Sequence, residues 1–152
     1  MENEQITSAL YTAFKSAVTD LRKKHHERFY YYVFVSDSPW CPYLSACSYE
    51  SYERLLASEE DDEEDDEGWR KWDYCDSEYC VYGYEEYFGE AAKLLAERAE
   101  GMDDDELYGD EWETRLASME EALRRLDSEG FFGTGENRNA VVINAECVPP
   151  SY

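Results

Sequence analysis

The chain has 152 residues, which is enough for one domain with a substantial core. Its 37 acidic and 14 basic residues give a net charge of −23. Such a charge repels phosphates, so it argues against binding naked DNA, RNA or an anionic membrane. It favours a basic partner, which would be attracted over long range. Solubility or adaptation to high salt would account for the charge equally well.

The five cysteines cannot all pair within one chain: Cys41, Cys47, Cys75, Cys80 and Cys147. The sequence opens with no signal-peptide pattern, and no apolar run approaches the length of a membrane span. We therefore expect a cytosolic protein with reduced thiols. Together with His25 and His26 the cysteines could supply zinc ligands. Their spacings match no standard zinc site, so we expect no metal and no other cofactor.

The first predicted element is a helix, with apolar residues at helical spacing from Ile6 to Leu21. Asn3 or Thr7 could cap it. The basic cluster Arg22 to His26 falls at its C-terminal end, where cations oppose the negative pole of the helix dipole. This position explains the cluster better than contact with nucleic acid does.

A strand is predicted over Phe29–Val35, which is aromatic and β-branched throughout. Because it is apolar on both faces, we expect a central strand that is covered on both sides. The segment Ser36–Pro39 ends it, and a shorter strand near Tyr43 to Cys47 follows. An antiparallel hairpin is the expected arrangement.

Ser48 is a good N-cap for a short helix over Tyr49–Ala57. Nine consecutive acids follow: Glu59, Glu60, Asp61, Asp62, Glu63, Glu64, Asp65, Asp66 and Glu67. They repel one another and have nothing apolar to bury, so 59–67 should be a mobile, solvated loop. The run lacks the glycine and the ligand spacing of an EF-hand, so we expect it to bind cations only weakly and nonspecifically.

The next segment, Trp69 to Tyr87, combines aromatic with acidic residues. Its first part has no clean period and should be irregular; a helix is expected from Tyr84 to a stop at Gly101. Charge speeds encounter with a partner and aromatic side chains act as hot spots. The candidate partner-binding residues are the nine acids together with Trp69, Trp72, Tyr74, Asp76 and Tyr79. Alternatively, Trp69 and Trp72 form a second core beneath the loop; Tyr82, Phe88 and Leu95 are expected in the core.

The last part of the chain predicts a helix, a turn and a strand. Asp110 with Glu113 fits a capping box, and an apolar stripe runs from Trp112 to Leu126. Gly130 should end the helix in the left-handed conformation, with Phe131 folding back on Leu126. A strand is predicted over Ala140–Ala145, and 148–152 should be a frayed tail.

The run Gly133-Thr134-Gly135 resembles a dinucleotide-binding fingerprint only superficially, because it is too short and precedes a strand. We interpret its glycines as turn residues. Arg138 should pair with a nearby carboxylate and fix this turn.

No catalytic constellation stands out in the sequence. The acids occur in solvated runs, where no pair is marked for acid–base chemistry. His25 and His26 are adjacent, so their side chains diverge, and no local motif marks a nucleophilic cysteine. We therefore predict that the protein is not an enzyme.

The N-terminal helix, the segment Phe29–Val35, the Trp/Tyr-rich centre, the run Ala122–Gly133 and Arg138 together resemble a bacterial domain family of unknown function. That family is associated with immunity proteins encoded beside polymorphic secreted toxins. Its specific signature here consists of Gly130, Phe131, Phe132, Gly133 and Arg138. The resemblance implies an α+β domain, a cytosolic location and a toxin-neutralising role, with no catalytic residues to transfer. The acidic stretch 59–67 is longer and more charged than the family would lead one to expect.

Taken together, these observations predict a single α+β domain over residues 1–147, with a small, mainly antiparallel sheet and about four helices. The leading hypothesis is an acidic immunity protein that neutralises a basic toxin, such as a nuclease or another enzyme acting on an anionic substrate. The second is a nucleic-acid mimic that inhibits a DNA-binding system. The third is a housekeeping domain whose acidity reflects its environment.

Overall fold

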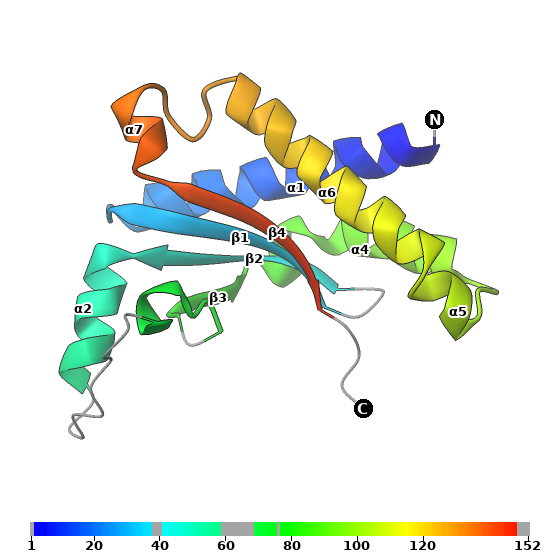
Figure 1. Cartoon of the computed structure of the whole chain (residues 1–152), viewed down its shortest axis with the longest axis horizontal. Helices are drawn as coiled ribbons and strands as arrows, with labels where there is room; N and C mark the ends of the chain where they lie inside the picture. Colours follow the sequence, from blue (N-terminus) through cyan, green and yellow to red (C-terminus); the bar gives the residue numbers. More distant parts are fainter. Residues whose placement is uncertain (1, 38–40, 59–68, 76, 149–152) are drawn as a thin grey trace.

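The sheet contains four strands in the order β3-β2-β1-β4 (Figure 1). A computed structural model describes residues 2–37, 41–58, 69–75 and 77–148 of the chain. The strands are β1 (Phe29–Asp37), β2 (Cys41–Ser48), β3 (Tyr79–Tyr82) and β4 (Val142–Val148). β2 pairs antiparallel with both β1 and β3, whereas β4 pairs parallel with β1. The α+β class, the mainly antiparallel sheet and the hairpin are therefore confirmed.

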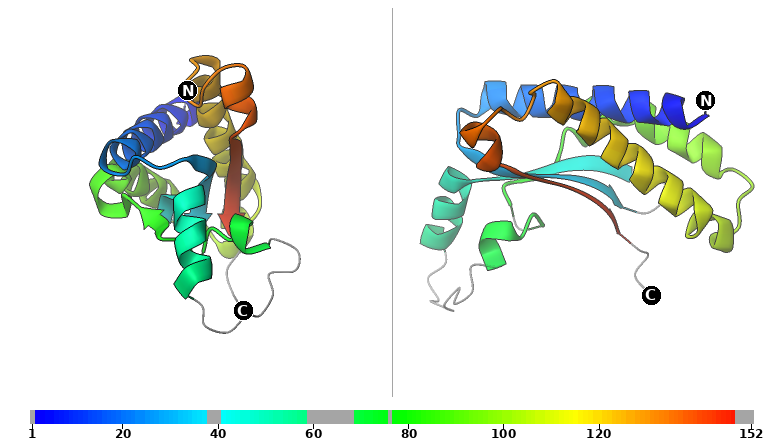
Figure 2. Two further views of the ribbon diagram at one scale, coloured as in Figure 1. Left: turned by 90° about the vertical axis from the view of Figure 1, so that its left-hand side faces the viewer. Right: turned by 45° about the horizontal axis from the view of Figure 1, so that its top comes forward.

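The helices are α1 (Glu2–Lys24), α2 (Tyr49–Ser58), α3 (Tyr84–Tyr87), α4 (Gly89–Ala99), α5 (Asp104–Leu107), α6 (Asp110–Ser128) and α7 (Glu136–Asn139), with a short 3-10 turn, η1 (Trp69–Trp72). α1, α4 and α6 cover one face of the sheet, while α2 and η1 lie toward the opposite face at one end (Figure 2). We call the first the helical face and the second the underside. α2 and α5 lie at opposite ends of the long axis of the molecule (Figure 1).

β1 is buried on both faces, as its sequence predicts. Tyr32 and Phe34 enter the main core on the helical face, where the rings of Phe14 and Phe34 stack at 4.3 Å. On the underside, Val33 and Val35 are completely buried in a second, smaller cluster. The strand therefore requires cover on both sides, because exposing the apolar side chains of either face to water would raise the free energy of the folded protein.

A β-bulge interrupts the β1–β2 pairing. Phe29 pairs with Ser48 and Tyr31 with Cys47, so Tyr30 is an additional residue on β1. Tyr30 and Tyr31 consequently both belong to the underside cluster, although adjacent strand residues ordinarily face opposite ways. The bulge thus adds an aromatic ring to the underside.

The predicted turn after α6 is confirmed. Gly130 has a φ of +79°; its N–H bonds to the Asp127 carbonyl at 3.0 Å, and the Phe131 N–H bonds to the Leu126 carbonyl at 3.1 Å. This pattern is a Schellman motif. The Arg138 guanidinium pairs with the Asp127 carboxylate at 2.6 Å and donates to the Val141 carbonyl at 2.8 Å, so it holds the turn as expected.

Several element boundaries differ from the predictions. α1 includes both of the proposed caps, Asn3 and Thr7, and Thr7 is buried. Asp110 is the first residue of α6 rather than its cap, because α5 ends so close by that Gly109 must make the turn. The last strand begins at Val142 instead of Ala140, since α7 occupies the preceding residues, and it includes Val148 from the predicted tail.

The predicted helix from Tyr84 to Gly101 is two helices, α3 and α4, that meet at Phe88. Phe88 is fully buried, and its ring lies edge-on to Phe34 at 5.7 Å. The break between α3 and α4 therefore falls at the residue whose ring is buried in the core. Leu95 is buried as predicted, while Tyr82 is half-buried against the core. The short strand β3 was not predicted; it has only four residues and an irregular register.

Gly130→Ala is expected to lower the free energy of unfolding by about 1–2 kcal/mol, because a Cβ atom disfavours the left-handed conformation. Gly89→Ala is the matched control: an added Cβ there meets no atom within 4 Å and its φ is not positive. This control should change stability by less than about 0.5 kcal/mol. Urea unfolding of both variants tests the turn, and equal effects of the two substitutions would contradict it.

Candidate interaction surface

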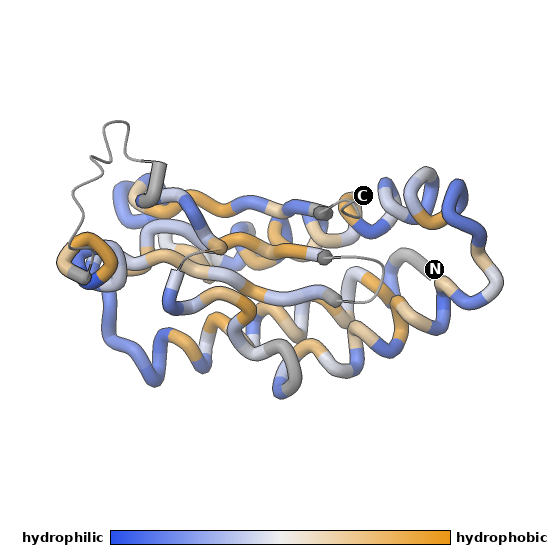
Figure 3. The backbone as a smooth tube through the Cα atoms, turned by 90° about the horizontal axis from the view of Figure 1, so that it is seen from below, coloured by the Kyte–Doolittle hydropathy of each residue, from blue (hydrophilic) through white to orange (hydrophobic). Residues whose placement is uncertain are grey.

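The underside of the sheet carries a cluster of aromatic residues. Its buried members are Tyr30, Tyr31, Val33, Val35, Tyr43 and Cys47, against which Tyr49 and Tyr74 pack. Figure 3 shows this side of the molecule. α2 supplies Tyr49 and the segment after η1 supplies Tyr74, so the two elements that cover the underside also flank residues 59–68. That stretch, with its nine predicted site acids, lies outside the described residues.

Trp72 packs against the underside cluster and is exposed at the molecular surface. It is 44% exposed, yet its ring lies edge-on to Tyr30 at 5.3 Å and to Tyr31 at 5.4 Å. The predicted core position therefore applies to Trp72 only in part, and its contact with a partner stays a prediction. For Trp69 only the backbone, in η1, is described, and Asp76 lies outside the described residues.

Tyr74 fastens the segment after η1 to the far edge of the sheet. Its hydroxyl donates to the Glu146 carboxylate on β4 at 2.6 Å. Burial and this neighbouring carboxylate both raise the pKa of Tyr74, so the hydroxyl keeps its proton and remains a donor. The contact joins residues that are 72 positions apart in the sequence, and it holds the segment that follows η1 against β4.

Tyr79 lies on the helical face, away from Trp72, and is only 5% exposed. Its hydroxyl donates to the Glu27 carboxylate at 2.6 Å. Glu27 also accepts from the Ser48 hydroxyl at 2.6 Å and from Arg54 at 3.0 Å. The structure thus places Tyr79 in a cluster centred on Glu27, and its contact with a partner stays a prediction.

The Glu27 cluster connects α2 to the rest of the fold. Ser48 caps this helix as predicted: its hydroxyl accepts from the Ser51 N–H at 3.0 Å. Burial alone raises the pKa of Glu27, but hydrogen bonds from Ser48, Tyr79 and Arg54 outweigh it and hold the pKa below its ordinary value. Sequence reasoning missed Glu27, because one acid in a short connection between elements carries no signal.

A second acidic surface lies at the α5 end of the molecule. It consists of eight exposed acids, Glu97, Glu100, Asp103, Asp104, Asp105, Glu106, Asp110 and Glu113. Beneath it, buried Glu111 pairs with Arg98 at 2.8 Å and with Arg115 at 3.0 Å. Arg115 also donates to the Leu95 carbonyl, which joins α6 to α4. The i,i+4 spacing of Glu111 and Arg115 is the sequence signal that could have predicted this ion-pair cluster.

The negative charge is not confined to residues 59–67. Removing their nine charges from −23 leaves −14 for the rest of the chain. Several arginines are engaged internally, among them Arg22, which donates to the Tyr32 hydroxyl and to the Phe131 carbonyl. The rest of the chain therefore carries a substantial negative charge of its own.

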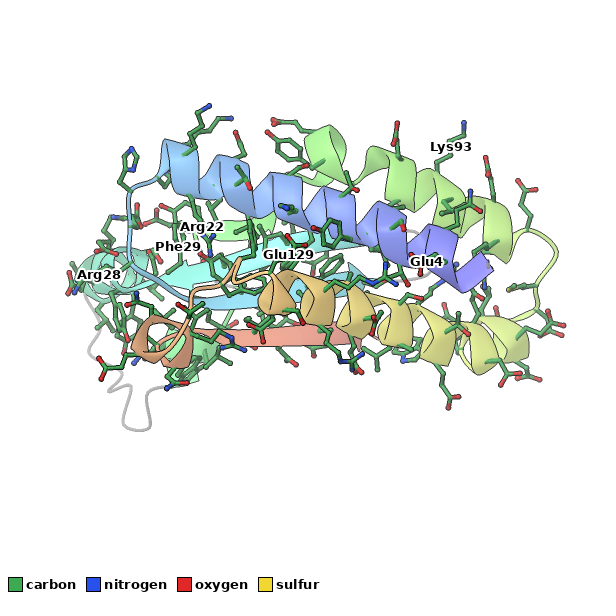
Figure 4. The ribbon with its side chains drawn as sticks, turned by 90° about the horizontal axis from the view of Figure 1, so that it is seen from above. Glu4, Arg22, Arg28, Phe29, Lys93 and Glu129 are labelled. Carbon is green, nitrogen blue, oxygen red and sulfur yellow. The ribbon has the colours of Figure 1, made fainter. Side chains whose placement is uncertain are left out.

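A groove of about 630 Å³ lies between α1 and α6 on the helical face. It is lined by Ser8, Tyr11, Thr12, Glu121, Arg124, Arg125, Ser128 and Glu129. Most of the surface that they present to the groove is apolar. Ion pairs of Arg125 with Glu4 and of Lys15 with Glu129 join the two helices beside it. Figure 4 shows this side, with Glu4 and Glu129 labelled. The groove is the size of a small-molecule site.

Within the described ranges, no group of three or more His, Cys, Asp or Glu side chains is arranged to hold a metal ion. Of the five cysteines, the side chains of Cys41 and Cys147 are not among those described. None of the helices in the described ranges is both long and apolar enough to cross a membrane.

Residues 10–152 match the model of a family described as a domain of unknown function, DUF4303, and the chain belongs to this family. The match includes the signature from Gly130 to Arg138. No curated protein and no solved structure matches the chain.

Glu27→Gln should destabilise the protein at neutral pH by about 1–2 kcal/mol, because a charged acceptor for three donor side chains, Ser48, Arg54 and Tyr79, is lost. Since the folded pKa of Glu27 is depressed, the stability it contributes is present above the unfolded pKa of about 4.3 and is lost as pH falls through the folded pKa. The difference between native and variant should therefore shrink below about pH 4.

Urea unfolding between pH 7 and pH 3 measures this difference. Glu53→Gln, an exposed acid on the same helix, is the control and should change stability little at any pH. A constant difference between native and Glu27→Gln across this range would contradict the account of the cluster.

Proposed function

We propose that the chain is an acidic binding protein that neutralises a basic protein partner. In its specific form, the proposal is an immunity protein that occludes the active site of a cognate bacterial toxin. The toxin would be a nuclease or another enzyme acting on an anionic substrate. Membership of DUF4303 is compatible with this role.

The observation that carries the proposal is the position of Trp72. A half-exposed indole, supported from below by two tyrosine rings, follows a run of nine acids by only a few residues. Charge of this kind steers a basic partner and raises the association rate, and a rigid aromatic side chain close to it in the sequence supplies a hot spot. These are complementary requirements of a fast and tight complex.

Occlusion requires no catalysis by this chain. Carboxylates would take the place of substrate phosphates at the partner's basic active site, and the aromatic underside would add contact area. In this proposal the protein acts in the cytosol, without a cofactor, and binds neither nucleic acid nor membrane. The negative charge of −14 that remains outside 59–67 supports such steering even without the acidic stretch.

The eight acids at the α5 end favour a second candidate, a nucleic-acid mimic. Such a mimic needs carboxylates held on folded elements at intervals similar to phosphate spacing. Seven of these eight acids lie on α4, on α6, or on α5 and its N-cap. The groove between α1 and α6 favours a third candidate, a housekeeping domain that takes a small-molecule ligand.

Affinity capture with the tagged chain at low salt, from the native host or after co-expression with the neighbouring reading frame, should recover a basic protein. Raising the salt to about 0.5 M should release it, because steering and charge pairing are screened. Recovery of no basic protein under these conditions would contradict the proposal.

Replacing 59–67 with a Gly/Ser linker of equal length should slow association with the captured partner by at least about tenfold. The comparison is a variant in which Asp103, Asp104, Asp105 and Glu106 become the corresponding amides. If the leading proposal holds, the linker has the larger effect on the association rate. A larger effect of the four amides would favour the mimic instead.

A further inference from the structure

Three aromatic rings surround the ammonium group of Lys71. Its Nζ atom lies 5.2 Å from the ring centre of Tyr30, 5.1 Å from that of Tyr49 and 5.4 Å from that of Trp72. The three rings come from β1, α2 and η1, so the fold brings together residues that are far apart in the sequence. We refer to Tyr30, Tyr49 and Trp72 as the cage.

The rings form walls rather than a stack. Tyr30 and Trp72 are nearly perpendicular, with an interplanar angle of 86°, and Tyr30 and Tyr49 are inclined at 43°. The position of Tyr30 depends on the β-bulge, and its hydroxyl donates to the Lys71 carbonyl. A bulge that places an additional side chain at a surface site is a common device next to functional sites.

This arrangement suits an organic cation. Each ring face is negative, and an ammonium within about 6 Å of the centroid is attracted to it. Within the described part of the chain, no carboxylate lies in ion-pair distance of Lys71 Nζ, so the rings are its main electrostatic partners there. Trp72 is 44% exposed, so one wall of the cage meets solvent.

We propose that the cage is a binding site for an alkylammonium group, which Lys71 fills in the free protein and which a lysine side chain of the basic partner fills in the complex. The identity of this occupant rests on the proposed function; the affinity of the cage for an alkylammonium group does not. Lys71 is thus an internal stand-in for the ligand.

The free energy of exchanging one ammonium group for another in the cage is close to zero. The incoming lysine gains the ring contacts that Lys71 gives up, and Lys71 moves into water at the surface of a strongly acidic protein. Because Lys71 is tethered beside the cage, it competes as if present at a millimolar or higher concentration. Removing it should therefore strengthen binding of an external cation, since a larger fraction of the cage is empty.

The direct test uses small probes and the free protein. The probes are Nα-acetyl-Nε-trimethyllysine amide, Nα-acetyllysine amide and, as a neutral isostere, Nα-acetylnorleucine amide. Binding is followed by the NMR shifts of the Trp72 indole N–H and the tyrosine ring protons. Lys71→Ala should bind both cationic probes about tenfold more tightly than the native chain does. The norleucine probe should shift the signals of neither protein.

Matched variants keep the test specific. Lys93→Ala removes an exposed lysine on α4, on the helical face (Figure 4), and should behave as the native chain does. Lys71→Gln removes the charge but keeps most of the side-chain length, and it replaces Lys71→Ala if the latter unfolds. Trp72→Ala in the Lys71→Ala background should weaken probe binding at least about fivefold, and Trp72→Phe should restore part of it.

If neither Lys71→Ala nor Lys71→Gln binds the cationic probes better than the norleucine probe while retaining a native unfolding transition, the cage is not a cation site. This result would leave the proposed function standing. Conversely, probe binding without capture of any basic protein would overturn the proposed function and its lysine occupant but support the cage. With the captured partner, Lys71→Ala should lower the dissociation constant at least about threefold, and an unchanged or higher constant would overturn the lysine occupant.

Discussion

β1 must be buried on both of its faces, and the architecture follows from this constraint. The helical face is covered by α1 and α6 over the rings of Phe14 and Phe34. In the described part of the chain no long helix covers the underside; aromatic side chains from α2 and from the segment after η1 cover it. A surface built from tyrosine and tryptophan is amphipathic, so the same residues can complete the core and present a contact surface.

Several of the few cations are engaged within the fold. Arg22, Arg115 and Arg138 donate to backbone carbonyls or to neighbouring side chains that fix helix ends and helix packing. Buried pairs such as Glu111 with Arg115 connect elements and use positive charge inside the molecule. The field that could attract a basic protein arises from the excess of 37 acidic over 14 basic residues, which no placement of the arginines can offset.

Much of this fold could be predicted from the sequence, because its signals are local. The two-faced pattern of β1, the Ser48 cap, the Gly130 turn and the Arg138 ion pair depend on residues close in the chain. The bulge at Tyr30, the break at Phe88 and the Glu27 cluster were not predicted, since each depends on contacts across long stretches of sequence. For the candidate surface, the sequence singled out Trp72 and Tyr74, which the structure places against the underside cluster; their contact with a partner stays a prediction. It could not indicate that Tyr79 is on the other face or that Lys71 enters an aromatic cage.

The central claim is that the underside at α2 and η1 is the contact surface for a basic partner. Amide hydrogen exchange of the chain alone and in complex with its captured partner tests this most directly. The account predicts that protection gained on binding concentrates in Tyr49–Ser58 and in the backbone from Trp69 to Tyr74. Protection confined to the α5 end, with exchange of these two segments unchanged, would contradict it.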